Sequence, residues 1–282
     1  MIGEIELPAA RGRLTALAGG RANGPPLLCL HGWLDNAASF QPLAPWLAGF
    51  RWVALDLPGH GGSGHRAPGH DYAFVDWLHD VLDALDALGW ERADLLGHSM
   101  GGAIASLLAA AVPERVRRLA LIEALGPLAG DPDQAGPRLR EAVQARRRLR
   151  PRPPRRIPDI DTAVNARLAA TKMERDAARR IVERNLQPFE GGYAWRSDPR
   201  LTLPAATRMP EAAVRSMLRL VEAPTLVIAA DPSPPWFTWE GLRERAACVA
   251  DIRLQQVPGG HHLHMEQPDV VGPLLRDFLA AD

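Results

Sequence analysis

The sequence is poor in cysteine and in long apolar runs. It has two cysteines, Cys29 and Cys248, and neither has the spacing of a metal-binding or redox motif. This usage favours a reducing compartment, so we expect a cytoplasmic protein. Residues 1–20 lack a basic start followed by an apolar run, which argues against a signal peptide. No stretch approaches the roughly 20 apolar residues that cross a bilayer, so we expect a soluble protein without membrane contacts.

The sequence also has no excess of charge of either sign. Its 33 basic residues balance 33 acidic residues, and the formal net charge is zero. This balance gives no general attraction to nucleic acid or to anionic membranes. Lys172 is the only lysine, which we interpret as a bias of composition. The oligomeric state stays open between a monomer and a homodimer.

Strand-like and helix-like segments alternate in two parts of the chain, residues 1–126 and 221–282. The alternation predicts a mainly parallel sheet with helices on both faces. Strands are expected at residues 2–7, 13–18, 26–30, 52–57, 93–96, 116–124, 225–230 and 252–257. Helices are expected from Ser39, as the N-cap, to Leu47, and at residues 72–88, 236–249 and 268–280.

Residues 127–220 interrupt this alternation. They are rich in proline and arginine, with helical patches and no strong strands. Because they separate two strands of one sheet, we predict a cap, or lid, over a core formed by residues 1–126 and 221–282. The stretch 138–156 contains nine arginines and one glutamate. We expect a solvated surface there, and a positive rim that attracts anionic substrates is the alternative.

The stretch ADLLGHSMGGAIASLLAA, residues 93–110, carries the strongest catalytic pattern. It combines a buried strand, a sharp turn around Ser99 and an apolar helix. In this G-x-S-x-G turn, Gly97 and Gly101 leave room for backbone that a Cβ would block. The amides at the start of the helix favour negative charge beside Ser99. An ordinary glycine-rich turn with a serine N-cap is the alternative, but the flanking strand and helix favour a nucleophile.

Six segments together resemble the α/β-hydrolases across nearly the whole chain: HGWLDNAASF, LDLPGHGGS, LGHSMGG, LIEALGP, GGYAWRSDPRL and GGHHLHMEQP. They are most similar to the serine-hydrolase-like branch, which is related to the epoxide hydrolase and haloalkane dehalogenase group. The resemblance implies an eight-stranded, mainly parallel sheet with an inserted helical cap. The epoxide hydrolases and haloalkane dehalogenases carry an aspartate nucleophile at the position of Ser99. A serine there would instead form an acyl-enzyme.

A serine nucleophile needs a histidine base within hydrogen-bond reach. The resemblance assigns this role to His261, which stands five residues before Glu266 of the E-x-P segment. His262 is the second choice, and His264 is expected to pack or to bind at the surface.

The third member of a triad should be a carboxylate that orients the base. In most α/β-hydrolases it follows the strand represented here by TLVIAA, but this chain has Ser233 at that position. Asp231, two residues earlier, is one substitute. Glu123 is the other and the preferred one, because some haloalkane dehalogenases carry their acid at the equivalent strand end. A structural ion pair of Glu123 with Arg117 or a cap arginine is the alternative.

An oxyanion hole needs two backbone amides. Met100, directly after the nucleophile, supplies one, and the resemblance assigns the other to Trp33. His31 and His60 lie at tight turns, and we interpret both as structural. The residues expected to line the pocket are Trp33, Phe40, Met100 and one or more of Trp236, Phe237 and Trp239.

These features predict a serine hydrolase of carboxylic esters or similar acyl substrates. Its partner would be a small-molecule acyl substrate, and it would require no metal or organic cofactor. A lactonase, thioesterase or carbon–carbon hydrolase could use the same residues, and so could a non-catalytic binding protein with this fold. Asp198 and Arg200 are weaker candidates for recognising polar ends of a substrate.

Overall fold

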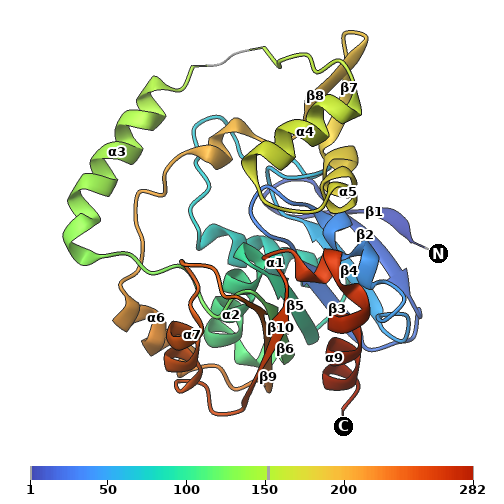
Figure 1. Ribbon diagram of the computed structural model, residues 1–282, viewed down its shortest axis with the longest axis vertical. Coiled ribbons are helices and arrows are strands. Elements are labelled where there is room, and N and C mark those ends of the chain that lie inside the picture. Colours follow the sequence, from blue (N-terminus) through green and yellow to red (C-terminus); the bar gives the residue numbers. More distant parts are fainter. Residues whose placement is uncertain (1, 151–152, 282) are drawn as a thin grey trace.

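An eight-stranded sheet forms the centre of the computed structural model, which describes residues 2–150 and 153–281. The strands lie in the order β1-β2-β4-β3-β5-β6-β9-β10. β2 pairs antiparallel with β1 and β4, and the other neighbours are parallel. The predicted sheet is therefore confirmed (Figure 1). The strand bounds are β1 (Gly3–Leu7), β2 (Leu14–Gly20), β3 (Pro26–Leu30), β4 (Arg51–Asp56), β5 (Ala93–His98), β6 (Val116–Ile122), β9 (Thr225–Asp231) and β10 (Ile252–Pro258).

Apolar side chains cover both faces of this sheet, because alternate residues of a strand point to opposite sides. Leu28 and Leu30 of β3 belong to one core, together with residues of α1, α2 and α7. Leu27 and Cys29 belong to a second core, together with residues of α9. The prediction of helices on both faces is thus confirmed. The helix bounds are α1 (Asp76–Ala87), α2 (Met100–Ala111), α7 (Trp239–Ala246), α8 (Leu263–Glu266) and α9 (Pro268–Ala280).

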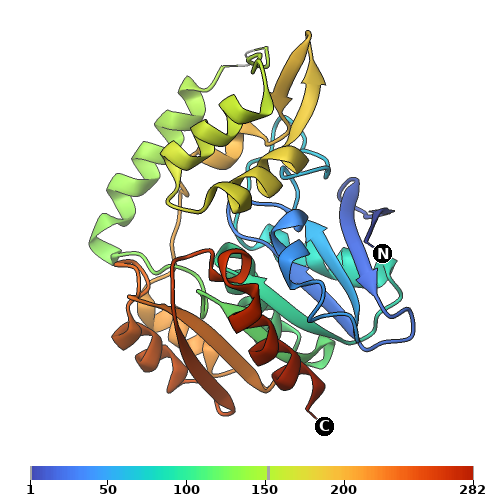
Figure 2. The same ribbon diagram turned by 45° about the vertical axis from the view of Figure 1, so that its right-hand side comes forward.

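The chain between β6 and β9 contains most of the remaining structure, and residues 127–220 are called the inserted segment below. Figure 1 shows α3 along the outer edge of the molecule, away from β7 and β8. In Figure 2, α4, α5 and the β7–β8 pair lie beyond one end of the sheet. Pro151 and Arg152 lie outside the described residues. The elements are α3 (Ala135–Arg148), α4 (Ile160–Ala170), α5 (Arg175–Asn185), β7 (Leu186–Phe189), β8 (Gly192–Trp195) and α6 (Glu211–Leu218).

β7 and β8 form an antiparallel hairpin in a segment whose sequence shows no strong strands. Each strand has four residues, which is too short for an alternating pattern to stand out. Glu190 and Gly191 between them have positive φ angles of 48° and 70°. Two such residues make the turn of a tight hairpin. The turn chemistry, more than strand propensity, therefore determines this element.

The chain after β3 also differs from the prediction that Ser39 caps a helix ending at Leu47. Asn36 instead caps a 3-10 helix, η1 (Ala37–Leu43), and its side chain accepts a hydrogen bond from the Ala38 amide at 3.1 Å. Asparagine caps helices as well as serine does, and Asn36 comes first along the chain. Within residues 2–150 and 153–281, no helix is both long and apolar enough to cross a bilayer.

Candidate active site

Ser99 occupies a strained turn between β5 and α2. Its φ is 50° and its ψ is −115°, a conformation that costs a non-glycine residue roughly 1–3 kcal/mol. A Cβ on Gly101 would lie 2.0 Å from the Leu30 carbonyl oxygen, and one on Gly97 would lie 2.4 Å from the Gly102 Cα. The glycines on either side are therefore required by close backbone approach. The turn presents the Ser99 hydroxyl at the end of the sheet.

His261 connects the Ser99 hydroxyl to an acidic side chain. Its Nε2 lies 3.0 Å from the Ser99 Oγ, and its Nδ1 lies 3.0 Å from the Glu123 Oε2. With a proton on Nδ1, the ring donates to the carboxylate and can accept the serine proton on Nε2. The three residues follow three different strands, β5, β6 and β10, whose carboxyl ends meet at one edge of the sheet.

Glu123 is held firmly although it is buried. Its side chain is fully enclosed, and its backbone φ is 56°. Its amide donates to the Ile228 carbonyl at 2.9 Å, and its Oε1 accepts from the Ala230 amide at 2.6 Å. These contacts satisfy a buried carboxylate without an arginine. The alternative ion pair with Arg117 is absent, because that arginine pairs with Asp94.

The end of β9 carries the two positions considered for a conventional acid. Asp231 is exposed there, and among the described contacts its carboxylate does not reach His261. Ser233 donates to the Ala230 carbonyl at 3.2 Å. The structure therefore brings Glu123, and not Asp231, to the imidazole. β9 contributes the Ala230 amide that fixes the carboxylate of the neighbouring strand.

The other two histidines of the cluster point away from Ser99. The His262 Nε2 lies 3.6 Å from the Asp35 Oδ2 in the interior. His264 is completely buried, with its ring centroid 4.2 Å from that of His98. Burial holds the pKa of His264 well below its usual value. The expectation that it packs is correct, but a surface role is wrong, because the short helix α8 turns it inward.

The two predicted oxyanion amides belong to Trp33 and Met100. Met100 is the first residue of α2, where helix amides have no partner within the helix. Among residues 2–150 and 153–281, neither amide donates to a loop or side-chain acceptor. A Cβ on Gly32 would lie 2.9 Å from both the Asp35 Oδ2 and the His98 Nδ1. Glycine therefore allows the Trp33 loop to approach the serine turn.

His31 and His60 support loops, as predicted. The His31 Nε2 accepts from the Leu57 amide at 3.0 Å, and the His60 Nε2 accepts from the Leu34 amide at 3.2 Å. Burial lowers the pKa of His60 to about 3. Both rings are neutral acceptors in the fold and do not approach Ser99.

The aromatic residues expected around the pocket divide into two groups. Trp33 and Trp236 are 52% and 60% exposed, and the Trp236 ring lies edge-to-face against His261 with centroids 6.0 Å apart. Phe40 and Phe237 are instead buried in the two cores of the sheet. The prediction that Phe40 lines the pocket is therefore wrong, because its ring is fully buried in the core. Of the alternatives Trp236, Phe237 and Trp239, the exposed Trp236 is the one that contacts His261.

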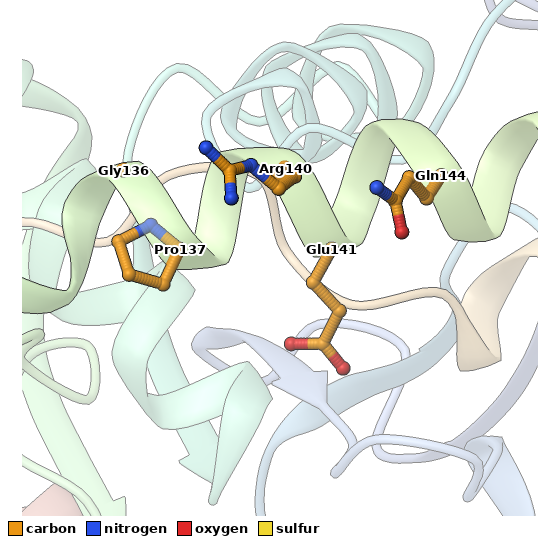
Figure 3. A pocket seen from close by; sticks show the side chains of 5 residues that line it. All are labelled: Gly136, Pro137, Arg140, Glu141 and Gln144. Atoms are coloured by element: carbon orange, nitrogen blue, oxygen red, sulfur yellow. The ribbon is translucent and has the colours of Figure 1, made fainter.

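A hollow of about 390 Å³ lies along α3 (Figure 3). Its lining comes from one helix alone, namely Gly136, Pro137, Arg140, Glu141 and Gln144. None of the Ser99, Glu123 and His261 side chains lines it. The hollow is thus separate from the candidate active site.

Asp198 and Arg200 are engaged with the protein itself. The Arg200 guanidinium binds the Asp198 carboxylate and the carbonyls of Ala67 and His70. Tyr72 donates a further hydrogen bond to Asp198 at 2.8 Å. The expectation that this pair recognises a substrate end is therefore wrong, because the donors of the arginine are already used.

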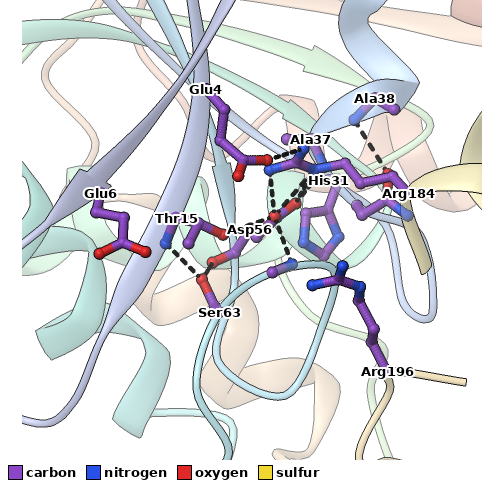
Figure 4. A network of polar contacts seen from close by, with 12 residues as sticks. Glu4, Glu6, Thr15, His31, Ala37, Ala38, Asp56, Ser63, Arg184 and Arg196 are labelled. Atoms are coloured by element: carbon purple, nitrogen blue, oxygen red, sulfur yellow. Dashed lines mark hydrogen bonds and ion pairs between the residues drawn. The ribbon is translucent and has the colours of Figure 1, made fainter. Parts of the chain in front are cut away.

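Two buried carboxylates near the site were not predicted from the sequence. Asp56, at the end of β4, accepts from Thr15, the amides of Ala37 and Gly62, and Arg184 of α5 (Figure 4). Asp35, two residues after Trp33, accepts from Arg167 of α4 at 2.5 Å. Their position in the HGWLDN and LDLPG segments was the available signal. Within the described residues, no group of three His, Cys, Asp or Glu side chains could hold a metal ion.

Comparison with known proteins agrees with this architecture. The model of the alpha/beta hydrolase fold family matches residues 25–268. A serine hydrolase-like protein of Dictyostelium discoideum is 33% identical over 276 residues, covering 93% of this chain and 76% of the relative. The crystal structure of a hypothetical protein from Pseudomonas aeruginosa PAO1 has a TM-score of 0.90 and 40% identity, covering 99% of both chains.

A thioesterase domain from the curacin biosynthetic pathway is also similar over its full length. The two structures have a TM-score of 0.85 and 25% identity, and each chain is covered completely. The family predicted from the six sequence segments is confirmed by these matches. The chain belongs to the α/β-hydrolase fold family and, within it, to the serine hydrolase-like proteins.

Proposed function

We propose that this serine hydrolase-like protein cleaves carboxylic esters or related acyl substrates through an acyl-enzyme. The observation that carries the proposal is the pair of 3.0 Å contacts from the His261 ring, one to Ser99 and one to Glu123. A base held between a hydroxyl and a buried carboxylate is the arrangement that activates serine for acyl transfer. We further propose that the inserted segment acts as a cap over this site.

The first half-reaction transfers the acyl group to the enzyme. The Ser99 Oγ attacks the carbonyl carbon while its proton moves to the His261 Nε2. The Glu123 carboxylate stabilises the resulting imidazolium, and the amides of Trp33 and Met100 donate to the oxyanion. The tetrahedral intermediate collapses, His261 protonates the leaving alcohol, and the acyl group stays on Ser99.

The second half-reaction releases the acid. Water takes the place of the alcohol and gives its proton to His261 as it attacks the acyl carbon. Collapse of this second intermediate breaks the bond to Ser99, and the proton returns from His261 to the serine oxygen. At the end of the cycle Ser99 and His261 have their original protons, and the ester and water have become the alcohol and the acid.

Exposed aromatic surface next to the reacting groups favours a moderately apolar acyl group. The Trp236 ring lies 6.0 Å from the His261 ring, and the half-exposed Trp33 follows Gly32 in the proposed oxyanion loop. Burying large aromatic side chains against a ligand supplies binding energy. A thioester is the second candidate substrate, since the full-length thioesterase domain is similar at 25% identity.

A non-catalytic binding protein remained possible from the sequence because Ser233 occupies the usual acid position. The contacts of Glu123 support catalysis. Burying a carboxylate costs folding free energy, and a catalytic role beside the His261 imidazole explains why the chain keeps it there. The choice between Glu123 and Asp231 is testable. Glu123→Gln should reduce p-nitrophenyl ester turnover by about 10³- to 10⁴-fold, whereas Asp231→Asn should stay within threefold. The opposite result in folded variants would assign the acid to Asp231.

Labelling with a fluorophosphonate probe tests the proposed chemistry directly. We expect stoichiometric labelling of the protein, loss of labelling in Ser99→Ala, and unchanged labelling in Ser216→Ala, a matched change of an exposed serine on α6. Turnover of p-nitrophenyl butyrate and of a butyryl thioester then separates the two substrate classes. A folded protein that neither reacts with the probe nor cleaves either substrate would refute a serine hydrolase.

A further inference from the structure

Asp35 lies between three loops that carry the reacting groups. It belongs to the oxyanion loop, two residues after Trp33, and is 1% exposed. Its Oδ2 lies 3.6 Å from the His98 Nδ1 and 3.6 Å from the His262 Nε2. His98 directly precedes Ser99, and His262 directly follows His261. One carboxylate therefore faces the neighbours of both the nucleophile and the base.

His98 extends this contact to the base itself. Its Nε2 lies 2.8 Å from the His261 carbonyl oxygen. A carbonyl can only accept, so the His98 Nε2 carries the proton and donates it. His98 is completely enclosed, and burial lowers its pKa to about 4. The neutral His98 ring therefore connects the turn at Ser99 to the loop that carries His261.

Arg167 connects the same carboxylate to the inserted segment. Its Nη2 donates to the Asp35 Oδ1 at 2.5 Å, and its Nη1 donates to the Leu34 carbonyl at 3.2 Å. Burial alone would raise the pKa of Asp35, but the facing His262 ring and the Arg167 charge hold it well below its usual range. The carboxylate is therefore ionised, with its Oδ1 bound by Arg167 and its Oδ2 facing the two imidazole rings at 3.6 Å.

We propose that Asp35 is a positioning residue of the hydrolytic reaction, through which Arg167 of α4 fixes the loops that carry Trp33, Ser99 and His261. This inference rests on the proposed serine hydrolase activity. Reacting groups displaced by about 1 Å can lose on the order of 100-fold in rate. A carboxylate that holds all three loops has more influence on that geometry than a contact within one loop.

Replacement of Asp35 separates positioning from general stability. Asp35→Asn keeps the shape but removes the charge, and we expect fluorophosphonate labelling to slow by 10- to 100-fold. The turnover number should fall by a similar factor while KM changes less than threefold. The matched control is Asp94→Asn, which removes a buried carboxylate paired with Arg117 at the opposite end of β5. That variant should lose stability but label within twofold of the wild-type rate.

Arg167 variants keep the test decisive if Asp35→Asn does not fold. Arg167→Met should slow labelling by at least 10-fold, and Arg167→Lys, which keeps the charge, should recover most of the rate. The double variant should be no slower than the slower single variant, because both changes break one link. Folded Asp35→Asn and Arg167→Met proteins that label at the wild-type rate would overturn this inference alone. Wild-type protein that does not label would overturn the proposed function and this inference with it.

Discussion

The inserted segment is attached to the sheet in two different ways. On one side, α4 and α5 reach buried carboxylates of the core through Arg167 and Arg184. On the other side, the main polar link of α3 is Arg146, which binds the exposed Asp71. Removing one partner of a buried ion pair lowers the unfolding free energy by several kcal/mol. An exposed ion pair contributes roughly 0–1 kcal/mol to that free energy. The helices of the inserted segment are therefore attached to the core with different strengths. The strength depends on whether their arginines bind a buried or an exposed carboxylate.

Packing follows the same division. Around α4 and α5, a small core includes Val164, Ala178 and Val182, and the Asn36 side chain donates to the Ile181 carbonyl at 2.8 Å. In α3, Ala142 is the buried residue, and Leu139 and Val143 are about half exposed. Regions with few buried contacts open locally at low cost. We therefore expect α3 to supply the movement of the inserted segment and α4 and α5 to supply its fixed frame.

Among the changes that test this comparison, removing Arg184 should lower the unfolding free energy the most. Arg184→Met leaves the fully buried Asp56 with one charged partner fewer, and the unfolding free energy should fall by about 3–5 kcal/mol. Urea unfolding measures the loss. Arg180→Met, an exposed position on the same helix, is the matched control and should change stability by less than about 0.5 kcal/mol. Equal effects of the two substitutions would show that α5 is not fixed by its buried pair.

Lowering the pH should have the second largest effect on stability. It acts on His60, which accepts from the amide of Leu34, the residue whose carbonyl binds Arg167 of α4. Burial holds the pKa of His60 near 3 in the fold, against about 6.5 in the unfolded chain. Between these values only the unfolded state binds the proton, so stability falls as pH falls through this window. At pH 5 the loss attributable to His60 is about 2 kcal/mol relative to neutral pH.

The pH effect is measured by urea unfolding at pH 7.5 and pH 5. His60→Gln should be less stable at pH 7.5 but should lose about 2 kcal/mol less than wild type on acidification. His70→Gln, a change at an exposed position, should retain the full loss. An unchanged pH difference in His60→Gln would contradict the neutral buried state of this ring.

Removing the α3 link should have the smallest effect on stability. Arg146→Met breaks the exposed pair with Asp71 and should cost about 0–1 kcal/mol. Amide hydrogen exchange should show α3 exchanging faster than α5 in wild type, and faster still in this variant. Arg147→Met on the same helix is the control. A loss above about 2 kcal/mol, or equal protection of α3 and α5, would remove the distinction between the two sides.

The sequence was most informative where chemistry is local. Each of these patterns occupies a few consecutive residues: the serine turn with its two glycines and the predicted oxyanion loop. Their spacing could therefore be recognised directly. The resemblance of another short segment selected His261 as the predicted base. The preference for Glu123 needed one further step, because it rested on the resemblance to some haloalkane dehalogenases and on the Glu123 strand lying next to the strand before Ser99, as β6 does beside β5.

Features that depend on distant partners could not be predicted in this way. Arg167 and Asp35 are 132 positions apart, and nothing near either residue specifies the other. The inward turn of His264 depends on α8 packing beside η1, and the burial of Phe237 depends on the core that its loop covers just before α7. Tertiary packing decides such positions, and a single sequence does not reveal it.

The chain just after Glu123 is anchored to the core before the inserted segment begins. Gly126 turns with a φ of 75°, its amide donates to the Ser106 Oγ at 3.1 Å, and the Leu125 carbonyl accepts from Arg245 at 2.8 Å. These anchors clamp residues 124–126 to α2 and α7 before α3 begins. We therefore expect any displacement of α3 to be absorbed beyond this clamp, so that the 3.0 Å contacts of His261 with Ser99 and Glu123 stay unchanged.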